Sequence, residues 1–181
     1  MKVTPTPLPG VLILEPREFT DPRGSFFESY NLRALDRALG REVRFVQDNH
    51  SSSARHVLRG LHYQIAQPQG KLVRVISGEV FDVAVDLRRS SPAFGTWHGM
   101  TLSARSRRQV WIPEGFAHGF LVLSDFAEVL YKTTDYYAPE HERTIRWDDT
   151  ALAIAWPVSG TPIVSARDAA GQAMADADCF D

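Results

Sequence analysis

Cysteine and long apolar runs are scarce in this chain. The one cysteine, Cys179, lies two residues from the end of the 181, which excludes a disulfide framework and fits a reducing compartment such as the cytosol. No apolar run is long enough to span a bilayer, and no secretory signal follows the N-terminal charge. The formal net charge of −2 gives no global attraction to nucleic acid or to an anionic membrane. We therefore expect a cytosolic protein with neither of these partners.

Lysine is also rare. Three of the 20 basic residues are lysines, namely Lys2, Lys71 and Lys132, and the other 17 are arginines. The planar guanidinium fork suits phosphate, so a local arginine cluster could hold an anionic ligand, although genomic base composition explains the bias more simply. A lysine in the interior of the sequence, such as Lys71, either reaches to a rim or is poised over a ligand.

The dominant hydrophobic period is two. From Glu79 to Arg88, apolar residues alternate with mostly polar ones, which predicts a strand with one buried face. Similar short strands are predicted at Val11–Glu15, Val43–Asn49, Lys71–Ile76, Gln109–Pro113, Gly119–Leu123 and Val129–Thr134. Many short strands separated by turn signals indicate a β-sandwich or barrel, and no linker divides residues 1–181, so we expect a single domain. An incompletely packed barrel interior would hold a small ligand.

Only one early helix is predicted. Asn31 can cap it, Leu32, Leu35 and Leu39 form its apolar stripe, and Gly40 can end it. The last residues, 173–181, are expected to form a short helix or a loose tail.

Four side chains could carry chemistry, but each has a plainer interpretation. His62 follows Arg59-Gly60-Leu61 and could be a histidine bonded to a backbone carbonyl. Lys71 opens a strand and could simply extend to the rim. His118 could be a turn histidine, and Tyr131 a core tyrosine with a satisfied hydroxyl.

Taken together, these segments resemble the cupin superfamily. Pro113-x-Gly115-x-x-His118 is similar to the second cupin motif, whereas the first motif is altered. Gln64 stands where that motif has its second histidine, and Lys71 stands where it has glutamate. An ammonium has no lone pair to donate and repels a divalent cation, so the pattern indicates a cupin without its metal.

A narrower resemblance covers the chain from about Val11 to Asp168. Its motifs are similar to those of the dTDP-4-dehydrorhamnose 3,5-epimerase family. They are Asp21-x-Arg23-Gly24-x-Phe26-x-Glu28, Gln47-Asp48-Asn49, Leu58-Arg59-Gly60-Leu61-His62-Tyr63-Gln64, Gly70-Lys71-Leu72-Val73-Arg74, Phe81 to Arg88, Ser91-Pro92-x-Phe94-Gly95-x-Trp97, Ile112 to Phe120 and Tyr131-Lys132-Thr133-Thr134-x-Tyr136-Tyr137. The resemblance implies an all-β cupin-type double-stranded β-helix, or jelly roll, with a few short peripheral helices.

The resemblance also implies roles for individual residues. His62 would be the general base, supported by Asp168, while Tyr131 would be the general acid and Lys71 would stabilise an enolate oxygen. Substrate contacts would fall on Arg23, Phe26, Glu28, Gln47, Asp48, Asn49, Arg59, Lys71, His118, Tyr137, Glu142 and Arg167. Tyr137 would stack on thymine. The family commonly has lysine where this chain has Arg167, and either cation can hold a phosphate.

The implied substrate is a dTDP-linked 6-deoxyhexose with a ketone at C4. Because C4 is already oxidised, no redox cofactor is expected, and the chain has no Gly-x-Gly-x-x-Gly segment. The resemblance further implies a homodimer that exchanges N-terminal strands. Three alternatives stay open: a metal-dependent cupin using His62 and His118, a non-catalytic nucleotide-sugar-binding jelly roll, and an epimerase acting at C3 or C5 alone.

Overall fold

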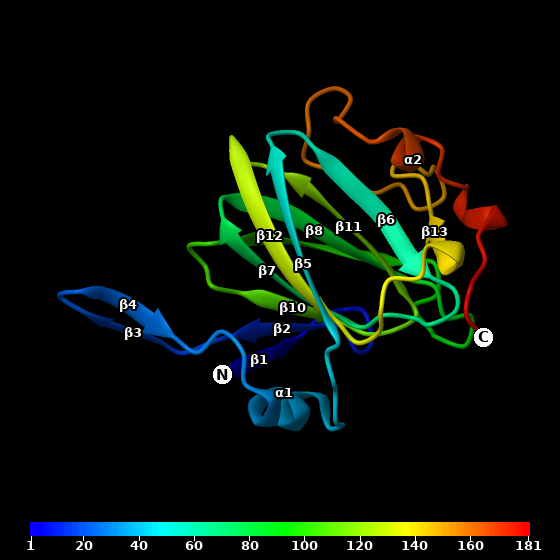
Figure 1. The fold of residues 1–181 in the computed structure, drawn as a ribbon. Coiled ribbons are helices and arrows are strands. Elements are labelled where there is room, and N and C mark those ends of the chain that lie inside the picture. Colours follow the sequence, from blue (N-terminus) through cyan, green and yellow to red (C-terminus); the bar gives the residue numbers. More distant parts are fainter.

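The computed structural model describes all 181 residues and is built mainly from antiparallel strands that form two facing sheets (Figure 1). The six-stranded sheet runs in the order β1 (Lys2–Pro5), β2 (Leu12–Glu15), β10 (Gln109–Ile112), β7 (Lys71–Ser77), β12 (Phe126–Thr133) and β5 (Gln47–Ala54). The five-stranded sheet runs in the order β13 (Glu142–Thr144), β6 (Leu58–Gln64), β11 (Phe116–Val122), β8 (Glu79–Asp86) and β9 (Trp97–Ser103). The predicted all-β jelly roll is confirmed.

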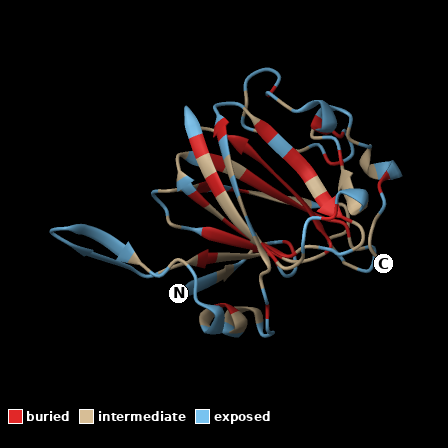
Figure 2. Ribbon diagram, viewed as in Figure 1, coloured by how far each residue is buried: buried red, intermediate tan, exposed pale blue.

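A two-stranded ribbon, β3 (Glu18–Asp21) and β4 (Gly24–Phe27), projects from the body (Figure 1). It is almost entirely exposed (Figure 2). The other elements are α1 (Leu32–Leu39), α2 (Ala166–Ala169) and two single 3₁₀ turns, η1 (Pro139–His141) and η2 (Met174–Asp176). No helix is both long and apolar enough to cross a membrane.

Helix α1 follows its local signals. The Asn31 side chain accepts a hydrogen bond from the Ala34 backbone N–H at 3.1 Å, and Gly40 ends the helix in the left-handed conformation at φ 67°. Leu35 is buried against Trp111 and Leu72 on the outside of the six-stranded sheet. The predicted helix is therefore confirmed.

The alternation in β8 is real, but the prediction of one buried face is wrong. Its apolar residues Val83 and Val85 face outward, beneath a cover formed by the C-terminal segments, which includes Ile145 and Leu152. Its other face lies between the sheets, where Ala84 joins the main core. Asp82 on that face is also fully buried. A polar residue therefore points into the space between the sheets.

Several strand boundaries differ from expectation. The strand predicted at Val43–Asn49 is β5, and it runs instead from Gln47 to Ala54, because Val43 and Phe45 pack against α1. The sequence pattern did not predict β1, β3, β4, β6, β9 or β13. The residues from 173 onward are anchored rather than loose: they contain η2, and Phe180 forms a bridge with Arg88.

The buried side chains form the floor of the barrel rather than filling it completely. The main core joins the two sheets and includes Val73, Val110 and Val129 from the six-stranded sheet, with Phe116 and Phe120 from the opposite one. Figure 2 shows the buried residues concentrated in the strands. At the other end of the interior, the inward-facing residues are polar, and a cavity remains.

Candidate active site

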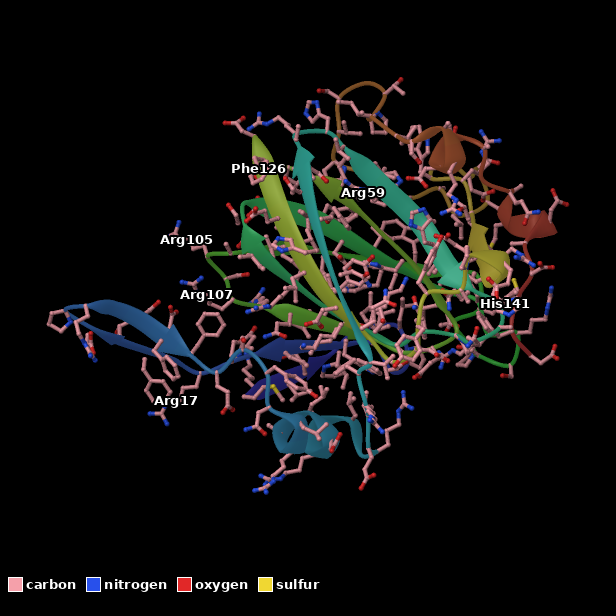
Figure 3. All side chains as sticks on the ribbon, viewed as in Figure 1. Arg17, Arg59, Arg105, Arg107, Phe126 and His141 are labelled. Carbon is pink, nitrogen blue, oxygen red and sulfur yellow. The ribbon has the colours of Figure 1, made fainter.

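A cavity of about 350 Å³ lies between the two sheets. Its lining residues come from six strands and two loops: Gln47, Asn49, Ser51, Arg59, His62, Tyr63, Gln64, Gln69, Lys71, His118, Gly119, Phe120, Tyr131, Tyr137 and Glu142. Most of these side chains are polar. Figure 3 shows Arg59 on β6, and its guanidinium donates to Ser53 Oγ of β5 at 3.0 Å. A polar, partly enclosed cavity of this kind suits a small ligand with many hydroxyl or phosphate oxygens.

His62 on β6 and the buried Asp168 form a hydrogen-bonded pair. His62 Nε2 lies 2.6 Å from Asp168 Oδ1, and Asp168 is 3% exposed. Ser165 caps the short helix α2 by accepting from the Asp168 N–H, which fixes the carboxylate behind the imidazole. Burial alone would raise the pKa of Asp168, but hydrogen bonds from His62 and Gly60 outweigh burial and hold that pKa below its ordinary value. The charged carboxylate can therefore stabilise an imidazolium.

Lys71 on β7 is a buried cation. It is 7% exposed, and Nζ donates to the His62 carbonyl oxygen at 3.1 Å, across from its own sheet. Burial lowers the pKa of Lys71 from 10.5 to about 8, against the opposing effect of Asp82 and Glu142. The ammonium is still charged near neutral pH. It has N–H groups left over for an oxygen in the cavity.

Tyr131 on β12 faces the same cavity from the six-stranded sheet. Burial raises the pKa of its phenol above the ordinary value of 10, so the hydroxyl keeps its proton. His62 comes from the five-stranded sheet. A proton acceptor and a proton donor thus face one cavity from opposite walls, an arrangement suited to general acid–base chemistry.

His118 forms a second histidine–aspartate pair. It is the Cα partner of His62 across β11 and β6, and its Nε2 lies 2.8 Å from Asp82 Oδ2. Both members are buried, and Asp82 Oδ1 has no hydrogen-bond partner. Sequence reasoning missed Asp82. The signal was available, because an aspartate two residues before Ala84 falls on the inward face of a strand.

The structure brings together most of the predicted binding residues. Gln47, Asn49, Arg59, His118, Tyr137 and Glu142 line the cavity. The Tyr137 hydroxyl donates to Glu142 Oε2 at 2.6 Å, and Arg167 Nη1 lies 2.5 Å from the same oxygen. Arg167 therefore reaches the cavity through Glu142 rather than lining it. Ser51, Gln64 and Gln69 also line the cavity but were not predicted there, although the alternation of Gln47 and Asn49 extends to Ser51.

Besides Arg167, four predicted binding residues do not line this cavity within one chain. Arg23, Phe26 and Glu28 lie on or just after the projecting β3–β4 ribbon, and Phe26 is 70% exposed. Asp48 alternates to the outer face of β5, where it accepts hydrogen bonds from Lys132 Nζ at 2.9 and 3.1 Å. The predicted contact between Asp48 and the substrate is therefore not supported within a single chain.

Two residues at the positions of the cupin metal ligands, Gln64 and Lys71, form hydrogen bonds with backbone carbonyl oxygens instead. The Gln64 amide donates to the carbonyl oxygens of Gln67 and Tyr136, and Lys71 holds its ammonium against the His62 carbonyl. The chain nowhere gathers three or more His, Cys, Asp or Glu side chains in an arrangement that could hold a metal ion. The two cavity histidines are each paired with an aspartate instead.

Comparison with known proteins gives consistent matches over nearly the whole chain. The family model for dTDP-4-dehydrorhamnose 3,5-epimerase matches residues 5–176. A Pseudomonas aeruginosa protein of that name is 64% identical over 180 residues, covering 99% of each chain. A Salmonella typhimurium protein of the same name is 59% identical, covering 94% of this chain and 93% of the relative. A solved dTDP-6-deoxy-D-glucose-3,5-epimerase from Legionella pneumophila, in complex with dTDP-4-keto-L-rhamnose, is 50% identical with a TM-score of 0.95, covering 98% of this chain and 94% of that one.

Proposed function

This chain belongs to the dTDP-4-dehydrorhamnose 3,5-epimerase family, and we propose that it converts dTDP-4-dehydro-6-deoxy-D-glucose into dTDP-4-dehydro-L-rhamnose in dTDP-L-rhamnose biosynthesis. The reaction inverts C3 and C5, the two carbons that flank the C4 ketone. The observation that carries this proposal is the placement of His62 and Tyr131 on opposite walls of one cavity, with the Lys71 ammonium beside them. Inversion at carbon needs proton removal on one face of the sugar and proton delivery on the other.

The chemistry follows from the pairs already described. The ketone acidifies the neighbouring C–H bonds, and the His62 imidazole accepts one of these protons. Asp168, 2.6 Å away, holds the imidazole in place and stabilises the charge that it gains. The electron pair left on carbon delocalises onto the C4 oxygen, and Lys71 stabilises this enolate. Because the ammonium is preorganised in a buried site, it needs no rearrangement when the charge appears.

Tyr131 completes the inversion. Its phenol is neutral, because burial raises its pKa, and it donates a proton to the carbon from the face opposite His62. Each inversion leaves His62 protonated and Tyr131 deprotonated, so exchange with water must restore both before the next one. The same groups act at the second carbon. All steps are proton transfers, which is why we expect no redox cofactor and no metal.

The nucleotide would occupy the part of the cavity nearest the rim. Arg59 and His118 are the cavity groups suited to the diphosphate, and Tyr137 offers an aromatic face, 48% exposed, for the thymine ring. Arg167 reaches the same region through Glu142. In this position arginine keeps the cationic character of the lysine common in the family.

The functional unit that we propose is a homodimer of single-domain chains in the cytosol, with exchanged N-terminal strands. Strand β1 is an edge strand with one unpaired side, which is a template for pairing with a second chain. The projecting β3–β4 ribbon exposes Phe19 by 50% and Phe26 by 70%, and a partner would cover them. A ribbon reaching into a partner's cavity would also account for Arg23 and Glu28. Light scattering should give the mass of two chains, and a monomer would contradict this assembly.

The experiment that tests the proposed function measures the incorporation of solvent deuterium into the sugar. Purified protein is incubated with dTDP-4-keto-6-deoxyglucose in heavy water, and NMR locates the deuterium. Label at both C3 and C5, with conversion to the L-rhamno product, is expected. Label at only one carbon would identify a single-position epimerase. Nucleotide binding without any label would identify a non-catalytic binding protein.

A further inference from the structure

The loop Asp135–Ala138 carries Tyr137 from the end of β12 to η1. Tyr137 is 48% exposed, and a half-exposed ring on a connecting loop is free to move unless its backbone is held. An aromatic ring that stacks on a base contributes most when it is already in position, because fixing it on binding costs conformational entropy. The hydrogen bonds of this loop therefore bear on nucleotide affinity.

Three glutamine side chains hold the loop backbone. Gln69 Nε2 donates to the Asp135 carbonyl oxygen at 2.9 Å, and the Tyr137 N–H donates to Gln47 Oε1 at 3.0 Å. Gln64 holds the two peptide groups on either side of Tyr137. Its Nε2 donates to the Tyr136 carbonyl oxygen at 3.2 Å, and its Oε1 accepts from the Ala138 N–H at 2.9 Å.

Of the three glutamines, Gln64 forms the most hydrogen bonds with the protein backbone. It is 4% exposed, and its second amide proton goes to the Gln67 carbonyl oxygen at 2.8 Å, so both donors are used inside the protein. Strand register also places Gln64 opposite Glu142, the acceptor of the Tyr137 hydroxyl. Gln64 thus holds the backbone on both sides of Tyr137, while its strand partner Glu142 accepts the hydrogen bond from the ring hydroxyl.

Glutamine is well suited to holding this loop backbone. A carboxylate has no donor for the two carbonyl oxygens, and a neutral imidazole has only one donor. A neutral amide supplies two donors and an acceptor in one plane, and it does not titrate. Gln64 stands where metal-binding cupins have a histidine ligand, so this position has an identifiable structural use in the present chain.

We propose that Gln64 is a positioning residue that fixes Tyr137 for stacking on the nucleobase, and so sets nucleotide affinity without taking part in proton transfer. This inference rests on the proposed function for the identity of the ligand. It assigns nucleobase affinity to a buried amide that faces the protein backbone rather than the nucleotide.

The test is a double-mutant cycle on dTDP binding by isothermal titration calorimetry. Gln64→Leu should raise the Kd for dTDP about 10-fold, as expected for partial loss of one base–aromatic stack. In the Tyr137→Ala background, the same change should alter Kd by less than about 2-fold, because the ring that Gln64 positions is absent. Turnover at saturating substrate should stay within about 3-fold of wild type while KM rises. Equal effects of Gln64→Leu in both backgrounds, or an unchanged Kd, would overturn the proposal.

Gln172→Leu is the matched control. It makes the same chemical change at an exposed position that pairs with the protein through its backbone, and it should leave Kd unchanged. Hydrogen exchange gives a readout that needs no ligand: the Ala138 amide should lose protection in Gln64→Leu and keep it in Gln172→Leu. If Gln64→Leu does not fold, Gln64→Glu removes the two donors at the same size and should show the same KM rise. Failure of wild type to bind dTDP would refute the proposed function, and exchange at Ala138 would then decide the positioning role by itself.

Discussion

Replacing Lys71 with methionine should make the protein more stable and almost inactive. Methionine has a similar length and no charge, so the change removes the buried ammonium while leaving the site filled. Lys71 is 7% exposed, and its one hydrogen bond is to the His62 carbonyl oxygen. It is held in a site that favours the neutral amine. The proposed chemistry needs the charged form.

The size of the effect follows from the pKa. Burial lowers the pKa of Lys71 from 10.5 to about 8. Between these values the unfolded chain binds more protons than the folded chain, so stability rises with pH over that interval. At about 1.4 kcal/mol per pKa unit, the ammonium destabilises the fold by about 3 kcal/mol at pH 7. Removing it takes one hydrogen bond from the His62 carbonyl oxygen, which costs about 1 kcal/mol. The variant should therefore be more stable by about 2 kcal/mol at pH 7, and its advantage should vanish by about pH 9.5.

Urea unfolding followed by fluorescence of the four tryptophans measures this difference at pH 7 and 9.5. Lys132→Met is the control, because Lys132 is paired with Asp48 at the surface and its loss should cost less than about 1 kcal/mol, with little dependence on pH over this range. The deuterium-exchange rate of Lys71→Met should fall about 100- to 1,000-fold. A variant less stable than wild type at pH 7, or a stability difference that does not change with pH, would refute the reasoning.

Four further outcomes are expected. His62→Asn should keep the fold by circular dichroism but abolish deuterium incorporation at C3 and C5; full exchange by this variant would remove His62 from the role of base. Asp168→Asn should lower turnover by about 10³- to 10⁴-fold, since an amide cannot stabilise the imidazolium or fix its tautomer; an unchanged rate would make Asp168 purely structural. Tyr131→Phe should still exchange protons on the His62 face, yet form product at least about 100-fold more slowly; normal product formation would exclude the phenol as the acid. Chelators should leave activity intact, given the committed amide of Gln64 and the ammonium of Lys71; loss of activity that a transition metal restores would revive the metal-dependent alternative.

Elements governed by local signals could be predicted from the sequence. Helix α1 begins after Asn31 and ends at Gly40 as expected, because a cap and a left-handed glycine act within a few residues. Strands with an apolar inward face, such as β7 and β12, were located to within a few residues. Hydrophobic periodicity did not predict the bounds of the strand that lines the cavity. Strand β5 reads Gln-Asp-Asn-His-Ser-Ser-Ser-Ala, and its inward residues are polar because they line the cavity.

The assembly of the active site could not be derived from residue patterns. His62 and Asp168 are 106 positions apart, and nothing local to either residue indicates the 2.6 Å contact. The resemblance to a known family supplied that pairing, and the structure contains it. The resemblance did not indicate that Asp82 pairs with His118 or that Gln64 holds the backbone beside Tyr137. These two residues contact other protein groups, so a motif of ligand contacts does not include them.

The two histidine–aspartate pairs are chemically alike but differ in access to water. His62 keeps 30% of its side chain exposed and His118 keeps 6%, although they are Cα partners on neighbouring strands. A base that takes a proton in every inversion must return it to solvent, and the exposed imidazole can do so. His118 is enclosed with Asp82, which suits a group held in a fixed position against a ligand. Solvent access therefore supports His62 as the proposed base and ligand binding as the proposed role of His118, although both histidines are paired with an aspartate.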